Sequence, residues 1–336
     1  MKKYIVISLL FAALLGGYMA LRKGAGEPPS RIYRIGILVR GSGYEPAVEG
    51  YRRKMAELGY QEGKNVVYDV RFVTAREELP GIVEEFLAEE VDLIHTYSTP
   101  ATQIAYQATK NRSPRTPIVF GSMGDPLISG VIHDIQRPGT NVTGVASLST
   151  ELTAQRLELL SRIKPGIKRV AMPHTSREAG DVAANKSVDI AEATAETLGI
   201  ELILFPVASA KDNAAAALRI SGENVEGMIV GGDSLVWGAI DVYIARAISE
   251  KIPLAAFDLA QVKKGALIGF GPDYAVSGEQ AAVLSHQIFR GLSPAEIPVA
   301  VPRKLILAIN RATERAIGVN IPDDILRKAD VIIEGE

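Results

Sequence analysis

Arg34-Ile-Gly-Ile-Leu-Val39 is a short, almost wholly apolar run, and it introduces a pattern that the rest of the chain repeats. A run of this length and composition predicts a strand buried on both faces, as in a parallel sheet. The following segment, 47–58, has helical spacing and is followed by Gly59, a residue suited to the left-handed turn that ends a helix. A buried strand followed by a helix is the first half of a βαβ unit.

The alternation of strand and helix continues along the chain. We expect further strands at 66–72, 91–97, 117–120, 141–146, 169–172, 201–207, 227–230 and 253–257. We expect the helices between them at 77–89, 100–110, 152–163, 181–198, 213–220 and 236–250. Two such series in 336 residues predict an α/β protein with two doubly wound parallel-sheet lobes joined by a hinge.

Composition excludes several classes of function. The chain has no cysteine, which excludes disulfides, thiolate catalysis and cysteine-ligated metals. Its four histidines are scattered and show no metal-binding spacing, so we expect neither a metal site nor a cofactor. A net charge of −2 provides no basic face for nucleic acid. The composition suits a soluble monomer with a large apolar core.

The first thirty residues have the pattern of an export segment. Lys2 and Lys3 precede the apolar run 4–21, and Arg22 and Lys23 close it. The run has no cysteine for lipid attachment and no clear cleavage site, so both a cleaved signal peptide and an uncleaved anchor remain open. Residues 24–30 (GAGEPPS) read as a linker. Either alternative predicts a domain in the periplasm or on the outer face of the membrane.

Polar side chains follow many of the predicted strands. In open parallel sheets ligands bind beyond the carboxyl ends of the strands, where helix N-termini gather. We therefore expect a ligand-binding cleft at this edge, with hydroxyls suited to an anionic group and carboxylates suited to an ammonium group. Thr99 is expected to cap the helix that follows it. The candidate binding residues are Tyr44, Ser98, Thr99, Ser122, Asp125, His174, Thr175, Asp233, Ser234 and Asp258.

Each of these residues also has a purely structural interpretation, because hydroxyls and Asp at such positions commonly cap helices. Tyr44 and Trp237 are suited to stacking on a ring-bearing ligand. Trp237, the only tryptophan, also fits a core position in its predicted helix. The sequence leaves both interpretations open.

Several stretches resemble the ABC transporter substrate-binding family that includes tryptophan- and tyrosine-type periplasmic receptors. They are 57–65 (ELGYQEGKN), 98–103 (STPATQ), 125–126 with 136–144 (DP and QRPGTNVTG), 262–267 (VKKGAL), 318–322 (GVNIP) and 327–330 (RKAD). The resemblance implies a type I periplasmic binding fold whose two lobes close on a small ligand and deliver it to a permease in the inner membrane. The ligand-lining loops of the family fall on Ser98, Thr99, Ser122, Asp125, Asp233, Ser234 and Asp258 of this chain.

The chain departs from the family pattern in two places. The loop after Met172 reads His174-Thr175-Ser176-Arg177, where the family usually has Asn-Pro, and Gly121 and Gly124 stand where hydroxyl residues are common. An altered set of polar contacts is therefore expected, and the resemblance does not by itself predict an ordinary amino-acid ligand. An amino-acid-like, aromatic or carboxylate compound is the expected class.

In such folds the chain passes between the lobes three times. We expect the crossovers near 147–150, 272–275 and 300–303, which assigns 31–147 and 275–300 to the first lobe and 148–272 and 301–336 to the second. A ligand-sensing receptor held on an uncleaved anchor is an alternative with the same fold. A Rossmann-like enzyme is disfavoured, because Pro46 stands where the third glycine of a dinucleotide motif beginning at Gly41 belongs.

Overall fold

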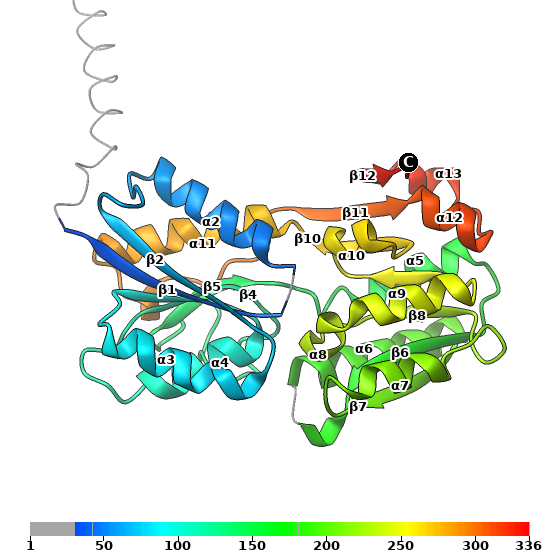
Figure 1. The fold of residues 1–336 in the computed structure, drawn as a ribbon, viewed down its shortest axis with the longest axis horizontal. Helices are drawn as coiled ribbons and strands as arrows, with labels where there is room; N and C mark the ends of the chain where they lie inside the picture. Colours follow the sequence, from blue (N-terminus) through cyan, green and yellow to red (C-terminus); the bar gives the residue numbers. More distant parts are fainter. Residues whose placement is uncertain (1–30, 42, 180–181, 336) are drawn as a thin grey trace, which may run out of the picture.

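A computed structural model describes residues 31–41, 43–179 and 182–335 of the chain. The expected export segment, 1–30, lies outside the described residues. Two separate sheets, each covered by helices on both faces, lie side by side (Figure 1). We call the first sheet with its helices lobe 1 and the second with its helices lobe 2. The prediction of two α/β lobes is confirmed.

The sheet of lobe 1 has five parallel strands in the order β2-β1-β3-β4-β5. Helices α2 and α11 cover one face and α3 and α4 the other (Figure 1). The strands are β1 (Tyr33–Arg40), β2 (Val66–Val73), β3 (Leu93–Tyr97), β4 (Ile118–Met123) and β5 (Val142–Ala146). The helical segments are α2 (Glu45–Glu57), η1 (Arg76–Glu78), α3 (Leu79–Ala88), α4 (Thr99–Thr109), α11 (Tyr274–Phe289) and η3 (Pro294–Glu296).

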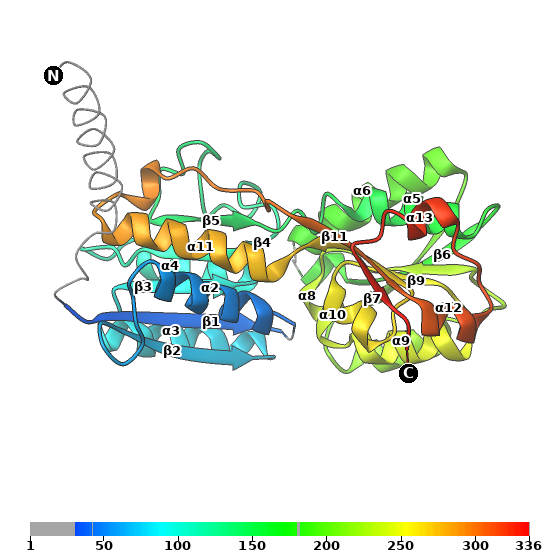
Figure 2. The same cartoon turned by 90° about the horizontal axis from the view of Figure 1, so that it is seen from above.

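The sheet of lobe 2 has seven strands in the order β12-β11-β10-β9-β8-β6-β7. The strands are β6 (Arg169–Thr175), β7 (Glu201–Val207), β8 (Gly227–Ile229), β9 (Leu254–Ala256), β10 (Ile268–Pro272), β11 (Leu305–Asn310) and β12 (Val331–Ile333). The helical segments are α5 (Thr153–Ile163), η2 (Arg177–Ala179), α6 (Val182–Leu198), α7 (Asp212–Arg219), α8 (Ser234–Gly238), α9 (Ile240–Ser249), α10 (Leu259–Lys264), α12 (Arg311–Ile317) and α13 (Asp323–Leu326). Figure 2 shows α5 and α6 on one side of this sheet and α9 and α12 on the other.

Three strands of lobe 2 were not expected from the sequence, and one pairing differs from the expected parallel arrangement. β10 and β11 pair antiparallel, with Ile268 opposite Ile309 and Pro272 opposite Leu305. Helix α11 and the segment after it separate these two strands along the chain (Figure 2). The chain leaves the sheet of lobe 2 along β10 and returns to it along β11, so the two strands run in opposite directions. The alternation of strands and helices in the sequence does not reveal this.

Helix α11 follows a lobe 2 strand in the chain but packs on α2 of lobe 1. Two glycines allow the close approach of these helices. A Cβ on Gly50 would lie 2.2 Å from the carbonyl oxygen of Ala275, and one on Gly278 would lie 2.0 Å from that of Ala47. The residues just before α11 belong to lobe 2, because they form β10, which pairs with β9 in the sheet of that lobe. The sequence-based lobe boundaries stay a prediction.

Buried Arg156 ties together two segments that lead toward lobe 1. Its guanidinium donates to the carbonyl oxygens of Ser149 and of Phe270 in β10, and to Thr153 Oγ1 at 2.8 Å. Burial lowers its pKa to about 9. Within the described part of the chain, no helix is long and apolar enough to cross a membrane.

Candidate ligand-binding site

A small cavity lies between the two lobes, at the carboxyl ends of strands from both sheets. Its volume is about 30 Å³. One water-sized group needs about 10–15 Å³, so the space suits only a few atoms. Six of the ten predicted binding residues line it: Tyr44, Ser98, Thr99, Ser122, Asp233 and Ser234. The ten other lining residues were not among the predicted binding residues, although Trp237 was named as suited to stacking: Pro100, Met123, Gly124, Ser147, Ser149, Ala183, Gly232, Trp237, Phe257 and Tyr274.

Ser98 has a strained backbone at the start of α4. Its φ is 93° and its ψ is 151°, a combination that almost only glycine adopts. Such a conformation costs about 1–3 kcal/mol and persists where the surrounding structure enforces it, often at ligand sites. The amide of Ser98 donates to the carbonyl oxygen of Ser122 at 2.9 Å, which fixes this geometry. The strain places the Ser98 hydroxyl at the cavity wall.

Ser98, and not Thr99, caps α4. The Ser98 side chain accepts a long hydrogen bond of 3.4 Å from the amide of Ala101. Thr99 instead accepts from the amide of Gly124 at 3.2 Å, which ties α4 to the loop after β4. The predicted cap was therefore one residue too late, because helix-boundary signals in a sequence do not fix the terminal residue. Both hydroxyls still line the cavity.

Further hydroxyls come from the segment that follows β5. Ser147 Oγ and Ser149 Oγ lie 2.8 Å apart, and both residues line the cavity. Next to them, the buried Thr150 Oγ1 has no hydrogen-bond partner among the described residues. A cluster of hydroxyl groups at the start of α4 and in this segment can donate to an anionic or carbonyl group of a ligand.

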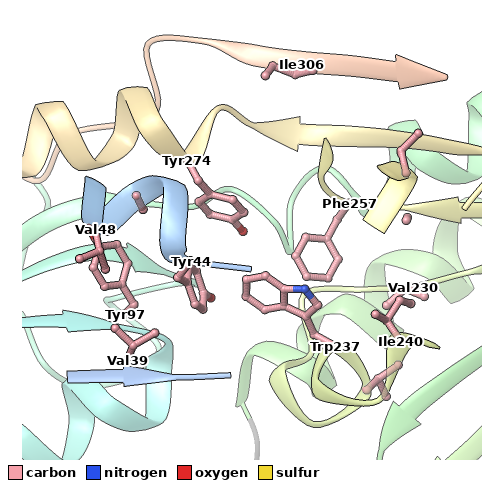
Figure 3. Close-up of a cluster of buried hydrophobic side chains, with 14 of the residues drawn as sticks. Val39, Tyr44, Val48, Tyr97, Val230, Trp237, Ile240, Phe257, Tyr274 and Ile306 are labelled. Atoms are coloured by element: carbon pink, nitrogen blue, oxygen red, sulfur yellow. The ribbon is translucent and has the colours of Figure 1, made fainter. Parts of the chain in front are cut away.

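Aromatic rings from both lobes meet beside these hydroxyls (Figure 3). The Trp237 ring, in α8 of lobe 2, lies 4.2 Å from the Tyr44 ring of lobe 1 and 5.0 Å from the Phe257 ring, edge to face in both cases. It also lies nearly parallel to the Tyr274 ring, with 5.9 Å between the centroids. Edge-to-face pairs of this kind each contribute about 0.5–1.5 kcal/mol, so the rings hold the two lobes together.

Asp233 lines the cavity, and its carboxylate accepts four hydrogen bonds within lobe 2. It caps α8 by accepting from the amides of Leu235 at 3.0 Å and Val236 at 3.1 Å. It also accepts from the amide of Thr175 and from Thr175 Oγ1, the latter at 2.8 Å. Three of these hydrogen bonds go to Oδ1 and one to Oδ2, so Oδ2 retains one acceptor site. Asp233 therefore gives the cleft wall its shape mainly through contacts within its own lobe.

Asp258 does not line the cavity but lies directly behind it, in the residue after Phe257. It caps α10 by accepting from the amide of Gln261 at 2.7 Å. Its second oxygen, Oδ2, is buried without a partner among the described residues. Burial raises the pKa of Asp258 to about 7. Burial is the main cause that raises the pKa of Tyr44 and of Tyr274, and the charge of Asp258 adds to it in both cases. Asp258 is therefore close to both of these cavity-lining rings.

Two polar contacts join the lobes around the cavity, and the sequence analysis identified neither Arg40 nor Lys186. Arg40 Nη1, at the end of β1, donates to Ser234 Oγ at 2.6 Å. Lys186 Nζ, in α6, donates to Asp125 Oδ2 at 2.6 Å. Burial acts to raise the pKa of Asp125, but the hydrogen bond from Lys186 and two backbone amides outweigh it and the pKa is lowered. Asp125 thus contacts the opposite lobe and not the cavity.

His174 and Thr175 lie apart from the cavity. His174 is buried, and its Nδ1 lies 2.8 Å from the carbonyl oxygen of Thr175. Thr175 borders a larger groove of about 440 Å³ between the lobes, together with Arg40 and Leu235. In the ranges that the structure describes, no group of three or more His, Asp or Glu side chains could hold a metal ion.

Two α/β lobes facing each other across a cleft, with helix N-termini and hydroxyls at its walls, define a type I periplasmic binding protein. The family model "ABC transporter substrate binding protein" matches residues 34–333, and the chain belongs to this family. The resemblance found in the sequence is thereby confirmed. Members of this family are solute-binding proteins.

Individual relatives agree with this assignment. The chain is 27% identical over 329 residues to a "Tyrosine-binding protein" of Clostridioides difficile (strain R20291), covering 93% of this chain and 92% of that protein. A conserved domain protein from Vibrio cholerae superposes with a TM-score of 0.83 at 26% identity, covering 90% of this chain and all of that one. The ABC domain from Streptococcus pneumonia in complex with L-Trp has a TM-score of 0.81 at 24% identity, with the same coverage.

Proposed function

We propose that the protein captures a small molecule in the cleft between its lobes and delivers it to the permease of an ABC importer, without catalysing a reaction. The observation that carries the proposal is the strained Ser98, whose hydroxyl is held at the wall of a cavity that both lobes line. Backbone strain of this kind clusters at active sites and ligand-binding sites, which supports the proposal. Family membership supports the transport role.

In this proposal the two lobes have different tasks. The start of α4, with Ser98 and Thr99, holds the polar or anionic end of the ligand, because helix N-termini and hydroxyls favour such groups. Ser234 and the rings of lobe 2 close over it. A ligand that touches both lobes favours the closed arrangement only through these added contacts. The apolar segment 4–21 would place the protein outside the cytoplasm.

A ligand screen tests the proposal. Residues 31–336 are mixed with amino acids, hydroxy acids, aromatic acids and nucleosides, and the melting temperature is recorded. A ligand at 100 times its Kd stabilises by about 2.7 kcal/mol, which raises the melting temperature by several degrees. The Ser98→Ala and Thr99→Ala double variant should bind the same compound several-fold to about a hundredfold more weakly, since each hydroxyl contributes about 0.5–1.5 kcal/mol. Unchanged affinity would show that Ser98 only caps α4 and that Thr99 only ties α4 to the loop after β4.

A further inference from the structure

The indole of Trp237 lies where the two lobes meet, at the wall of the cleft and within an apolar cluster that includes residues of both lobes. It is 3% exposed, and its ring contacts come from both lobes: Tyr44 and Tyr274 on one side and Phe257 on the other (Figure 3). Three rings arranged around a fourth form a slot that fits one aromatic group. In this chain the protein's own side chain occupies that slot.

The opposite wall is shaped to admit the indole. Gly43, in the loop after β1, has a φ of 88°, and a Cβ at this position would lie 2.8 Å from Cζ2 of Trp237. Real side-chain carbons do not approach that closely, so any larger residue at Gly43 would displace the indole or separate the lobes. Gly43 and Trp237 are thus complementary across the cleft, although 194 residues separate them in the chain.

The space that remains beside the indole is small and polar. Its volume is about 30 Å³, room for only a few water-sized groups, and hydroxyls of Ser98, Ser122, Ser147 and Ser149 surround it. Neighbouring Asp233 makes four hydrogen bonds within lobe 2 and retains one acceptor site on Oδ2, beside the hydroxyls and the start of α4. These groups suit a carboxylate with a short polar chain.

We propose that Trp237 is a specificity-determining residue that fills the aromatic slot of the cleft and restricts the ligand to a short-chain amino or hydroxy acid. The inference rests on the proposed function, since it names the ligand class of the same cleft. A ring-bearing amino acid would have to displace the indole from three aromatic contacts and from the Gly43 surface. Removing the indole opens a slot of matching shape and chemistry, as buried apolar cavities accept rings of their own size.

The experiment compares the wild type with Trp237→Ala and Trp237→Leu, using isothermal titration calorimetry with L-tryptophan, L-tyrosine, glycine, L-alanine, glycolate and L-lactate. The Leu variant retains apolar packing in case the Ala variant does not fold. Phe205→Ala, which truncates a buried ring of lobe 2 outside the cleft, is the matched control. Unfolding curves confirm that each variant is folded.

We expect the wild type to bind one of the short-chain acids and neither aromatic amino acid. At least one Trp237 variant should bind L-tryptophan or L-tyrosine at least tenfold more tightly than the wild type, and Phe205→Ala should not. Equal or tighter binding of an aromatic amino acid by the wild type overturns the inference and leaves the proposed function intact. Absence of any gain in folded Trp237 variants also overturns it. The proposed function fails only if the broader ligand screen finds no compound that stabilises the wild type.

Discussion

Lobe 1 meets the cleft with hydroxyls on a strained helix start, whereas lobe 2 meets it with the Trp237 ring and with Asp233, whose hydrogen bonds are made within its own lobe. Ser98 keeps a conformation that costs stability, while Asp233 accepts four hydrogen bonds that stabilise its own lobe. The difference teaches that residues in similar positions, each between a strand and the N-terminus of the next helix, need not have equivalent roles. Lobe 1 is built to bind and lobe 2 to define shape.

The carboxylates Asp258 and Asp125 should give the largest contrast, because their pKa values move in opposite directions. Asp258 has a pKa of about 7 in the folded protein against an ordinary value of 3.8, so between these pH values the unfolded chain ionises while the folded protein keeps the proton. The stability cost is small at pH 4, grows as the pH rises from about 4 to 7, and levels off above 7. Since one pKa unit corresponds to about 1.4 kcal/mol, the cost approaches about 4 kcal/mol at pH 8.

Asp258→Asn should therefore be more stable than the wild type at pH 8 and nearly equal to it at pH 4, as measured by urea unfolding. Asp125→Asn is the matched control in lobe 1. Its lowered pKa means that the charged form is stabilising above the ordinary value of 3.8, so the variant should lose stability at neutral pH, and the loss should disappear as the pH falls through the lowered pKa. If both variants changed the free energy of unfolding in the same direction at neutral to alkaline pH, the expected contrast between the two carboxylates would be wrong.

The next largest effect is expected at Asp233. Asp233→Ala removes the α8 cap and leaves the amide and hydroxyl of Thr175 without their acceptor, which should cost about 3 kcal/mol. Chemical denaturation gives the free energy of unfolding, and calorimetry gives ligand affinity. Asp233→Asn keeps one acceptor oxygen and should recover part of the loss. A folded Asn variant of normal stability that no longer binds ligand would make Asp233 a ligand contact instead.

Ser98 should behave in the opposite way. Ser98→Gly relieves the strained backbone and should raise stability by about 1 kcal/mol while weakening ligand binding about tenfold. Ser98→Ala keeps the strain and loses the hydroxyl, so it should lower affinity without the gain in stability. The comparison uses thermal unfolding and calorimetry on the same samples. If the Gly and Ala variants were equally stable, the backbone of Ser98 would not be strained enough to affect stability.

The smallest effect is expected at the contact between Lys186 and Asp125. The side chains are 31% and 18% exposed, so the pair should be worth at most about 1 kcal/mol and weaken with salt. Because it joins the lobes, Lys186→Met should increase the radius of gyration in small-angle scattering at low salt. Arg112→Met breaks an exposed pair with Glu84 inside lobe 1 and should leave the radius unchanged. Equal radii for all three proteins would show that the pair does not influence closure.

The sequence alone determined the strand–helix alternation, and with it the two lobes and the edge at which a ligand would bind. This was possible because burial on both faces of a strand and helical spacing are local properties of the chain. The same rule placed Ser98, Ser122 and Asp233 at the cavity. It could not find β11, whose antiparallel partner β10 is separated from it by a helix of the other lobe.

Only the tertiary structure decided which polar groups remain available and where Trp237 lies. Arg40 and Ser234 are 194 positions apart in the chain and touch only because the lobes meet. Two of the four hydrogen bonds that Asp233 accepts come from Thr175, which precedes it by 58 residues. The sequence was compatible with Trp237 in a core helix and with Trp237 at the cleft wall. Its position beside Gly43 of the opposite lobe is seen only in the tertiary structure. Contacts between distant segments follow from how the two lobes pack, which no local pattern encodes.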